Sequence, residues 1–329
     1  MNISKSIVDF VKLHRHEKII ICGHESPDVD STSSQFALQF LLQKLGMREV
    51  YCVKQKKYPE NIQSLLTELP VISLEDIDKN SLLVCVDCSA LRRISEKVSS
   101  VITNVVLQID HHASNENYAE INLVEEYASA TAEIISSIFL DLKITPSLPI
   151  ARLLYAGIIS DSRSFSLPMI TEKTFDIAKW LLGCGVETSH IHNLVFNSEP
   201  IEKINLIKAL YDRIELFSNG KICVGVIFSK DIKKINANNV DKTGLLEKLL
   251  LIKNVEIALT IVEMENYLKV NIRSLSMNYN LNEIAEFYGG GGHFEASAFI
   301  VKNKSIRDLK TELIKDLESR YFVKQEDFL

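Results

Sequence analysis

The chain has 329 residues, of which 46% are hydrophobic and 24% are charged. This length exceeds what one hydrophobic core usually supports, so we expect two domains of an ordinary globular protein and exclude a disordered chain. A formal net charge of −6 and a pI near 5.8 exclude a broad basic surface for long nucleic acid, because such binding depends on neutralising phosphates.

The first two-thirds of the chain alternates short apolar runs with longer helical patterns. We predict strands at 18–22, 50–53, 82–86 and 105–109, and helices at 33–45, 130–142, 150–159 and 172–182. Such alternation favours a parallel sheet flanked by helices. Ligands of open α/β sheets bind outside the carboxyl ends of the strands, so residues that follow the strands are candidates for a site.

After Gly185 the pattern changes to that of a smaller α+β domain. We predict a helix at 200–217, strands at 222–228, 256–262, 267–272 and 297–301, and helices at 282–288 and 305–321. The predicted fold class is therefore α/β, with an N-terminal parallel sheet and a smaller C-terminal α+β domain. The predicted boundaries are 1–190 for the first domain, 191–218 for a helical linker and 219–329 for the second domain.

Four segments of the first domain each end in carboxylates or imidazoles. These residues are His24, Asp28 and Asp30 after the first strand, Asp87 after the third, Asp110, His111 and His112 after the fourth, and Asp161 after a helix. A single aspartate after a strand is usually a turn or helix cap. Capping does not explain why all four segments supply ligands suited to manganese, iron, zinc or magnesium, and two such ions suit phosphoryl hydrolysis.

These motifs resemble the DHH family of phosphoesterases. Asp110-His111-His112 is similar to the family signature, and His24-x-x-Pro27-Asp28-x-Asp30 is similar to its first motif. Asp87-Cys88-Ser89 with Arg93, and the segment 157–162 with Phe165, resemble two further motifs. In the C-terminal part, Gly289-Gly290-Gly291-Gly292-His293 and the segment 270–274 resemble the DHH-associated domain of nano-RNases, pAp phosphatases and RecJ-like exonucleases.

The resemblance implies two Mn²⁺ ions per chain. One ion would be held by His24 and Asp28 and the other by Asp30 and His111, with Asp87 and Asp161 bridging both. Asp110 would orient the following imidazoles, as metal-bound histidines usually require, and His112 would face the scissile phosphate. Backbone N–H groups of Gly290, Gly291 and Gly292 would approach phosphate, and Arg273 and His293 would bind the far end of the substrate.

The function implied is two-metal hydrolysis of short oligoribonucleotides (nano-RNA), pApA or 3′-phosphoadenosine 5′-phosphate (pAp). A manganese inorganic pyrophosphatase and a non-catalytic nucleotide-binding sensor remain alternatives; the glycine-rich motif argues against the first and the intact ligand set against the second. No apolar run approaches the roughly 20 residues of a membrane span. We therefore expect a cytoplasmic protein with small nucleotide or RNA substrates and no membrane partner, and a homodimer stays open.

Overall fold

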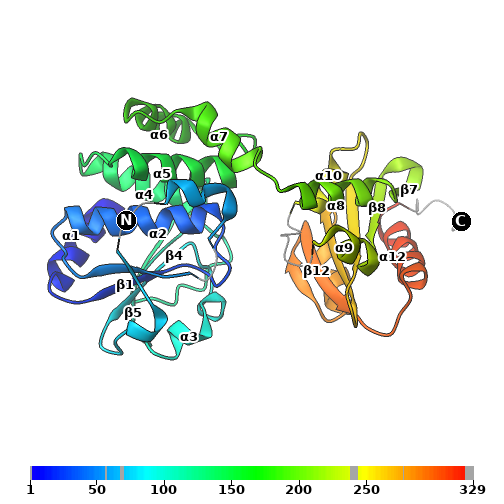
Figure 1. Cartoon of the computed structure of the whole chain (residues 1–329), viewed down its shortest axis with the longest axis horizontal. Coiled ribbons are helices and arrows are strands. Elements are labelled where there is room, and N and C mark those ends of the chain that lie inside the picture. Colours follow the sequence, from blue (N-terminus) through cyan, green and yellow to red (C-terminus); the bar gives the residue numbers. More distant parts are fainter. Residues whose placement is uncertain (1, 56–57, 67–69, 238–243, 277, 323–329) are drawn as a thin grey trace, which may run out of the picture. The chain divides into compact units, whose positions relative to one another are not determined.

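A computed structural model describes residues 2–55, 58–66, 70–237, 244–276 and 278–322, and its elements are labelled in Figure 1. The chain divides into two compact units, Met1–Ser198 and Glu199–Leu329. This division falls within the segment 191–218 that we predicted as a linker. The predicted class, an α/β unit with a parallel sheet followed by a second α+β unit, is confirmed.

The first unit is built on a six-stranded sheet in the order β3-β2-β1-β4-β5-β6. Every neighbouring pair in this sheet is parallel. The strands are β1 (Ile19–Cys22), β2 (Val50–Val53), β3 (Val71–Ile72), β4 (Leu82–Val86), β5 (Val105–Asp110) and β6 (Ile121–Val124). Because helices cover both faces, the central strands β1, β4 and β5 are nearly continuous apolar runs.

Most helices of this unit lie on one face of the sheet. They are α1 (Ile3–His14), α2 (Val29–Lys44), α4 (Thr131–Asp141), α5 (Leu148–Asp161), α6 (Glu172–Gly183) and α7 (Thr188–Phe196). Figure 1 shows α2 and α4 nearest the sheet, α5 above them, and α6 and α7 further out. The short α3 (Glu96–Ser99) covers the opposite face, where Val98 packs with Ile20 of β1. Helix α2 is thus sandwiched between the sheet and other helices, which explains why most of it is buried.

Helix α2 begins four residues earlier than predicted. Asp28 accepts a hydrogen bond from the Ser31 amide and caps the helix, so the polar run after Asp28 is helical rather than a loop. The helix ends before Gly46, whose φ of +100° suits a glycine just past a helix end. The early start matters for the site, because it puts Asp30 in the first turn of α2.

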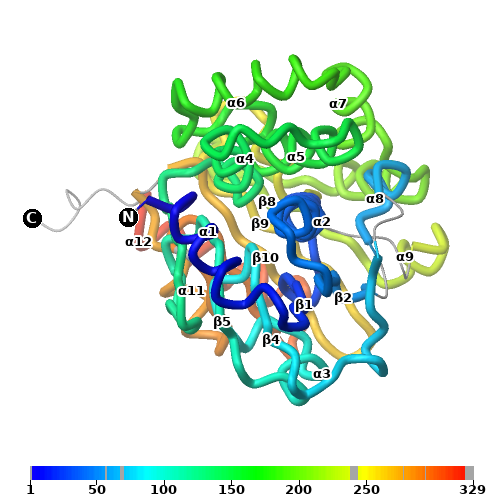
Figure 2. The backbone as a smooth tube through the Cα atoms, turned by 90° about the vertical axis from the view of Figure 1, so that its left-hand side faces the viewer, coloured from blue at the N-terminus to red at the C-terminus, as the bar shows by residue number. Residues whose placement is uncertain are grey.

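The second unit holds a mixed sheet in the order β11-β12-β10-β9-β8-β7. Only the pair β8 and β9 is parallel. The strands are β7 (Glu215–Phe217), β8 (Ile222–Ile227), β9 (Ile257–Glu263), β10 (Leu268–Ser274), β11 (Gly291–His293) and β12 (Ala296–Val301). One core lies under α11 (Leu281–Phe287) and α12 (Ile306–Tyr321), and another under α8 (Ile201–Tyr211), α9 (Ser229–Ile235) and α10 (Leu245–Leu250). Figure 2 traces both units as a tube.

The prediction of one helix over 200–217 is wrong. Helix α8 ends at Tyr211, and Glu215–Phe217 pairs with β8 as the strand β7. A turn that contains Asn219 and Gly220, both with positive φ, returns the chain into β8. Helix α7 packs in the first unit through Ile191, whereas α8 packs in the second through Leu206 and Leu210. Among the described residues, no helix is both long enough and apolar enough to cross a membrane.

Leu210→Ala tests whether α8 is an integral part of the second unit. Leu210 is 0% exposed, and truncating such a leucine usually costs about 2–5 kcal/mol of unfolding free energy. Hydrogen exchange measured by mass spectrometry should therefore become faster in 199–322 and stay unchanged in 2–198. Leu38→Ala in α2 is the matched control and should give the opposite pattern. Faster exchange of the first unit in Leu210→Ala would contradict this assignment of α8.

Candidate metal centre

The predicted ligands meet at the carboxyl edge of the parallel sheet. His24 follows β1, Asp87 follows β4, His111 follows β5, Asp28 and Asp30 lie at the start of α2, and Asp161 is the last residue of α5. The side chains form three groups, and within each group the ligand atoms lie within 4.8 Å of one another. The groups are His24, Asp28 and Asp87; Asp30, His111 and Asp161; and Asp87, His111 and His112. The first two groups have no residue in common, so the geometry suits two adjacent ions.

Asp87 lies between the two imidazoles. Its Oδ2 is 3.9 Å from His24 Nε2, and its Oδ1 is 3.6 Å from His111 Nε2. The two oxygens of one carboxylate therefore face two different histidines. The backbone of Asp87 has a φ of +53°, a conformation that Asp and Asn tolerate better than most residues. Burial, followed by the charges of Asp30 and Asp28, raises the pKa of Asp87 well above its usual range.

Asp28 divides its carboxylate between structure and site. Its Oδ1 accepts from the Ser31 amide at 2.9 Å and caps α2, while its Oδ2 is 3.7 Å from His24 Nε2. Burial favours the neutral acid, but the His24 and Ser31 contacts outweigh it and lower the pKa of Asp28. A role as helix cap and a role as ligand are therefore compatible in this residue.

Asp30 is fully buried and joins α2 to α4. Its two oxygens accept from the backbone amides of Thr131 and Ala132 at 2.7 and 2.9 Å, which are the first residues of α4. The residue before them, Ala130, has no capping side chain, so Asp30 takes that place. A Cβ at Gly157 of α5 would lie 2.8 Å from Asp30 Oδ1, so only glycine leaves room there. Burial and the nearby Asp161 raise the pKa of Asp30 to about 8.

His111 presents one ring nitrogen to the site. Its Nδ1 is 3.2 Å from the Ala128 carbonyl, which fits a proton on Nδ1 and a lone pair on Nε2. The Nε2 is buried and makes no hydrogen bond, although it lies 3.3 Å from Asp161 Oδ2. Burial alone would lower the pKa of His111, but contact with Asp161 and the charges of Asp30 and Asp87 raise it to about 10, so the Nε2 lone pair becomes available when a cation takes the place of the second proton. A buried nitrogen without a hydrogen-bond partner, aimed at carboxylates, is what a metal ligand requires.

Asp110 orients His112 rather than both imidazoles. Its Oδ1 accepts from His112 Nδ1 at 2.7 Å, and its other oxygen accepts from Asn115. Burial opposes ionisation, but these contacts outweigh it and lower the pKa of Asp110. The expectation that Asp110 also orients His111 is wrong, since the Ala128 carbonyl takes that role.

The first unit therefore fits divalent cations. Carboxylates that are crowded and buried repel one another, as the raised pKa values of Asp30 and Asp87 reflect. A bound cation would offset this repulsion. Oxygen and imidazole ligands without thiolate suit manganese, magnesium or iron.

The predicted substrate residues lie in the second unit. Arg273 of β10 pairs with Glu247 of α10 at 2.7 Å. A Cβ at Gly290 or Gly292 would meet backbone atoms of β12 at 2.3 and 2.4 Å, so both glycines are required by packing between strands. A Cβ at Gly291 would meet only Asn282 Oδ1, at 3.9 Å, among the described atoms, so this side of the glycine is open. The backbone of His293 is in β11, and its side chain lies outside the described part of the chain.

Sequence reasoning missed several residues that hold the ligands in place. They are Asn115, Ala128, Thr131 and Ala132, which contact Asp110, His111 and Asp30, and the Thr131 hydroxyl also donates to Asp87 at 3.1 Å. Most of these contacts use backbone atoms, which leave no signal in residue type. The Thr131 hydroxyl is the exception, because a threonine at a helix start would be considered as a cap.

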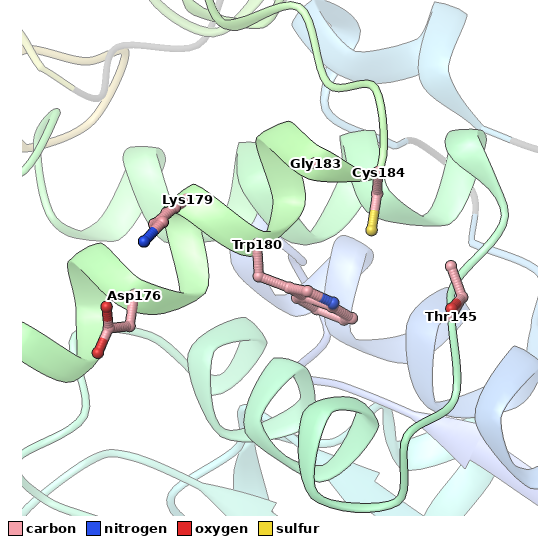
Figure 3. A pocket seen from close by; sticks show the side chains of 6 residues that line it. All are labelled: Thr145, Asp176, Lys179, Trp180, Gly183 and Cys184. Atoms are coloured by element: carbon pink, nitrogen blue, oxygen red, sulfur yellow. The ribbon is translucent and has the colours of Figure 1, made fainter.

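A surface pocket of about 500 Å³ lies away from these ligands, along α6 (Figure 3). Its lining comprises Thr145, Asp176, Lys179, Trp180, Gly183 and Cys184. Figure 3 shows the indole of Trp180 extending toward Thr145. Trp180 also packs against the core of the first unit, which fits the structural role that its helical spacing favours.

Asp87→Asn and His24→Ala test whether Asp87 serves two ions. Asn keeps the shape and tolerates positive φ, so Asp87→Asn should fold with unchanged circular dichroism. At a metal concentration a hundredfold above Kd, each bound ion stabilises the fold by about 2.7 kcal/mol. Mn²⁺ should therefore stabilise wild type by about 5 kcal/mol, His24→Ala by about half of that, and Asp87→Asn least. Equal metal content and equal stabilisation in both variants would contradict a shared Asp87.

Comparison with family models gives two matches that follow one another along the chain. Residues 18–158 match the DHH family, N-terminal domain, and residues 219–321 match the DHHA1 domain. The first match contains all of the candidate ligands except Asp161, and the second contains Arg273 and the glycine run.

Curated proteins and solved structures agree with these matches. A Streptococcus mutans protein named probable bifunctional oligoribonuclease and PAP phosphatase NrnA is 29% identical over 287 residues, or 87% of this chain and 90% of the relative. The Bacillus subtilis protein named bifunctional oligoribonuclease and PAP phosphatase NrnA is 26% identical and covers 95% of each chain. An exopolyphosphatase-related protein from Bacteroides fragilis superposes with a TM-score of 0.83 at 20% identity, covering 96% of this chain and 97% of that chain, and so shares the fold. The chain therefore carries the N-terminal domain of the DHH family followed by a DHHA1 domain.

Proposed function

We propose that this protein hydrolyses short oligoribonucleotides, pApA and pAp with two Mn²⁺ ions per chain. The observation that carries the proposal is the pair of ligand groups on either side of Asp87. Oligoribonuclease and PAP phosphatase are the activities named for the Streptococcus mutans and Bacillus subtilis relatives, which align with this chain over nearly their whole length. The dinucleotide pApA is itself a short oligoribonucleotide. Six unpaired cysteines fit a reducing cytoplasm, which we include in the proposal.

Each ion would have its own histidine. His24 and Asp28 would hold one ion, Asp30 and His111 the other, and Asp87 and Asp161 would contact both. Support for Asp87 comes from its two oxygens, which face different imidazoles. Divalent ions at this position supply a nucleophile at neutral pH and neutralise charge on the phosphate oxygens.

Protein groups beside the ligands have separate roles. His112 donates a hydrogen bond from Nδ1–H to Asp110, so its Nε2 is left to face the scissile phosphate, to which it would donate in the protonated form. Asp110 fixes this orientation and is itself held by Asn115. Thr131 donates to Asp87 and fixes the direction of that carboxylate. These contacts keep the site in a preorganised geometry, which lowers the cost of reaching the transition state.

The second unit would contribute substrate binding through Arg273, His293 and the glycine run 290–292. In the described part of the chain, Arg273 donates from Nη1 to Glu247, so the other edge of the guanidinium fork suits a phosphate. Of Gly290, Gly291 and Gly292, Gly291 has open space on the side where a side chain would stand, which a phosphate needs to approach the backbone. The acidic net charge of −6 fits local recognition of a small substrate rather than a long strand.

Two rival functions make different predictions. A manganese pyrophosphatase would share the metal ligands but hydrolyse pyrophosphate. The DHHA1 match over 219–321 agrees instead with the resemblance of the C-terminal part to nano-RNases and pAp phosphatases. A nucleotide sensor without activity would bind substrate and release no product. The intact ligand set disfavours this second rival.

The testing experiment is a product time course on a 5′-labelled pentaribonucleotide, pApA, pAp and pyrophosphate. Metal-stripped protein should be inactive on all four, and added Mn²⁺ should restore turnover of the first three substrates. Calcium, which prefers more ligands at longer distances, is the control ion and should restore little activity. Full activity after chelation, or turnover of pyrophosphate alone, would overturn the proposal.

Arg273→Ala should leave metal content unchanged, because Arg273 lies in the other unit from the ligands. A hydrogen bond to a charged group is worth roughly 1.5–3 kcal/mol, so kcat/KM on pApA should fall by about 10- to 150-fold. Arg273→Lys should recover only part of the loss, since lysine lacks the planar fork. Ile300→Ala, an exposed position on the neighbouring strand β12, is the control. An unchanged kcat/KM in Arg273→Ala would remove this residue from the substrate site.

A further inference from the structure

Tyr127 is an aromatic side chain without a visible structural role. It is 87% exposed, the largest exposed fraction of any large hydrophobic residue in the described part of the chain. No ring contact, cation contact or side-chain hydrogen bond of Tyr127 occurs among the described residues. A scattered surface aromatic would need no explanation, so the position of Tyr127 decides whether its exposure matters.

The backbone around Tyr127 is held firmly. Tyr127 lies in a turn between β6 and α4, closed by the Ala128 amide, which donates to the Glu125 carbonyl at 3.0 Å. The Glu125 amide donates in turn to the Asp110 carbonyl at 3.0 Å. The Glu125 side chain pairs with Lys173 of α6 at 3.2 Å. The turn therefore presents its aromatic ring from a fixed base.

This turn adjoins the metal centre. The carbonyl of Ala128, the next residue after Tyr127, is 3.2 Å from His111 Nδ1. Three residues further on, Thr131 contacts both Asp30 and Asp87. Consecutive Cα atoms are about 3.8 Å apart, so the backbone of Tyr127 directly adjoins a residue whose carbonyl contacts a candidate ligand.

The charges nearby select the kind of ligand. Glu126 precedes Tyr127 in the turn and disfavours a second phosphate at this position, whereas the charge of Glu125 is balanced by Lys173. A nucleobase is neutral at pH 7 and offers a flat π-face, and stacking on an aromatic ring is a common mode of binding single-stranded nucleic acid. A base next to the scissile phosphate therefore fits both the ring and its surroundings.

We propose that Tyr127 is the stacking platform for the nucleobase adjacent to the scissile phosphate. This inference rests on the proposed function, because it presumes a nucleotide substrate at the metal centre. It assigns a specificity-determining role to a residue outside the candidate ligand set. The platform selects for the presence of a base rather than for its identity, because every base has a π-face.

The test compares wild type, Tyr127→Ala and Tyr127→Phe on pApA and on two dinucleotides in which one or the other base is removed. Loss of one base–aromatic stack corresponds to about 5- to 100-fold in affinity. Tyr127→Ala should raise KM on pApA by that factor with kcat nearly unchanged, because stacking acts equally on ground and transition states. Tyr127→Phe keeps the ring and should behave as wild type. On the dinucleotide that lacks the stacked base, wild type and Tyr127→Ala should be equal.

A second readout does not depend on turnover. Fluorescence of 2-aminopurine in a methylphosphonate-linked dinucleotide, which resists hydrolysis, should be quenched by wild type and not by Tyr127→Ala. Equal KM values for wild type and Tyr127→Ala on pApA would overturn the platform and leave the proposed function intact. The same holds if Tyr127→Ala raises KM by the same factor on pApA and on both dinucleotides that lack a base. If wild type cleaves none of the nucleotide substrates and quenches no fluorescence, the proposed function and the platform fail together.

Discussion

The contact on which the centre depends is the one between the Asp30 carboxylate and the amino terminus of α4. Asp30 accepts hydrogen bonds from the first two amides of α4, and this helix has no capping side chain of its own. The contact fixes the start of α2 against the start of α4, and Gly157 of α5 leaves room for the carboxylate between them. Favourable interaction with a helix terminus is worth up to about 2 kcal/mol. That is less than the penalty for burying a charge, so a nearby cation is needed to keep Asp30 ionised.

The penalty for buried negative charge also has to be offset in the rest of the centre. The charges that raise the pKa of Asp30 and Asp87 are those of neighbouring carboxylates. Without an ion the site is a repulsive cluster held by packing and backbone hydrogen bonds, and with an ion its ligands are already aligned. Fixed groups such as the Ala128 carbonyl and the Thr131 hydroxyl preserve this alignment. Metal binding then carries little free-energy cost for ordering the ligands.

Much of this architecture could be predicted because it depends on local patterns. Apolar runs predict strands such as β4 and β5, and the polar residues that follow these runs predict the edge of the sheet where the site forms. Backbone contacts could not be predicted in this way. The Ala128 carbonyl that orients His111 and the amides that hold Asp30 are backbone groups, which leave no signal in residue type. Strand β7 was missed for a related reason, since its three residues continue a helical pattern and become a strand only by pairing with β8.

The central claim is that two ions sit on either side of Asp87, and anomalous diffraction at the manganese edge tests it most directly. Crystals grown with Mn²⁺ should give two strong anomalous peaks per chain at this site. One should lie among His24, Asp28 and Asp87, and the other among Asp30, His111 and Asp161, with one oxygen of Asp87 directed at each. A single peak, or two peaks that do not share Asp87, would contradict the account.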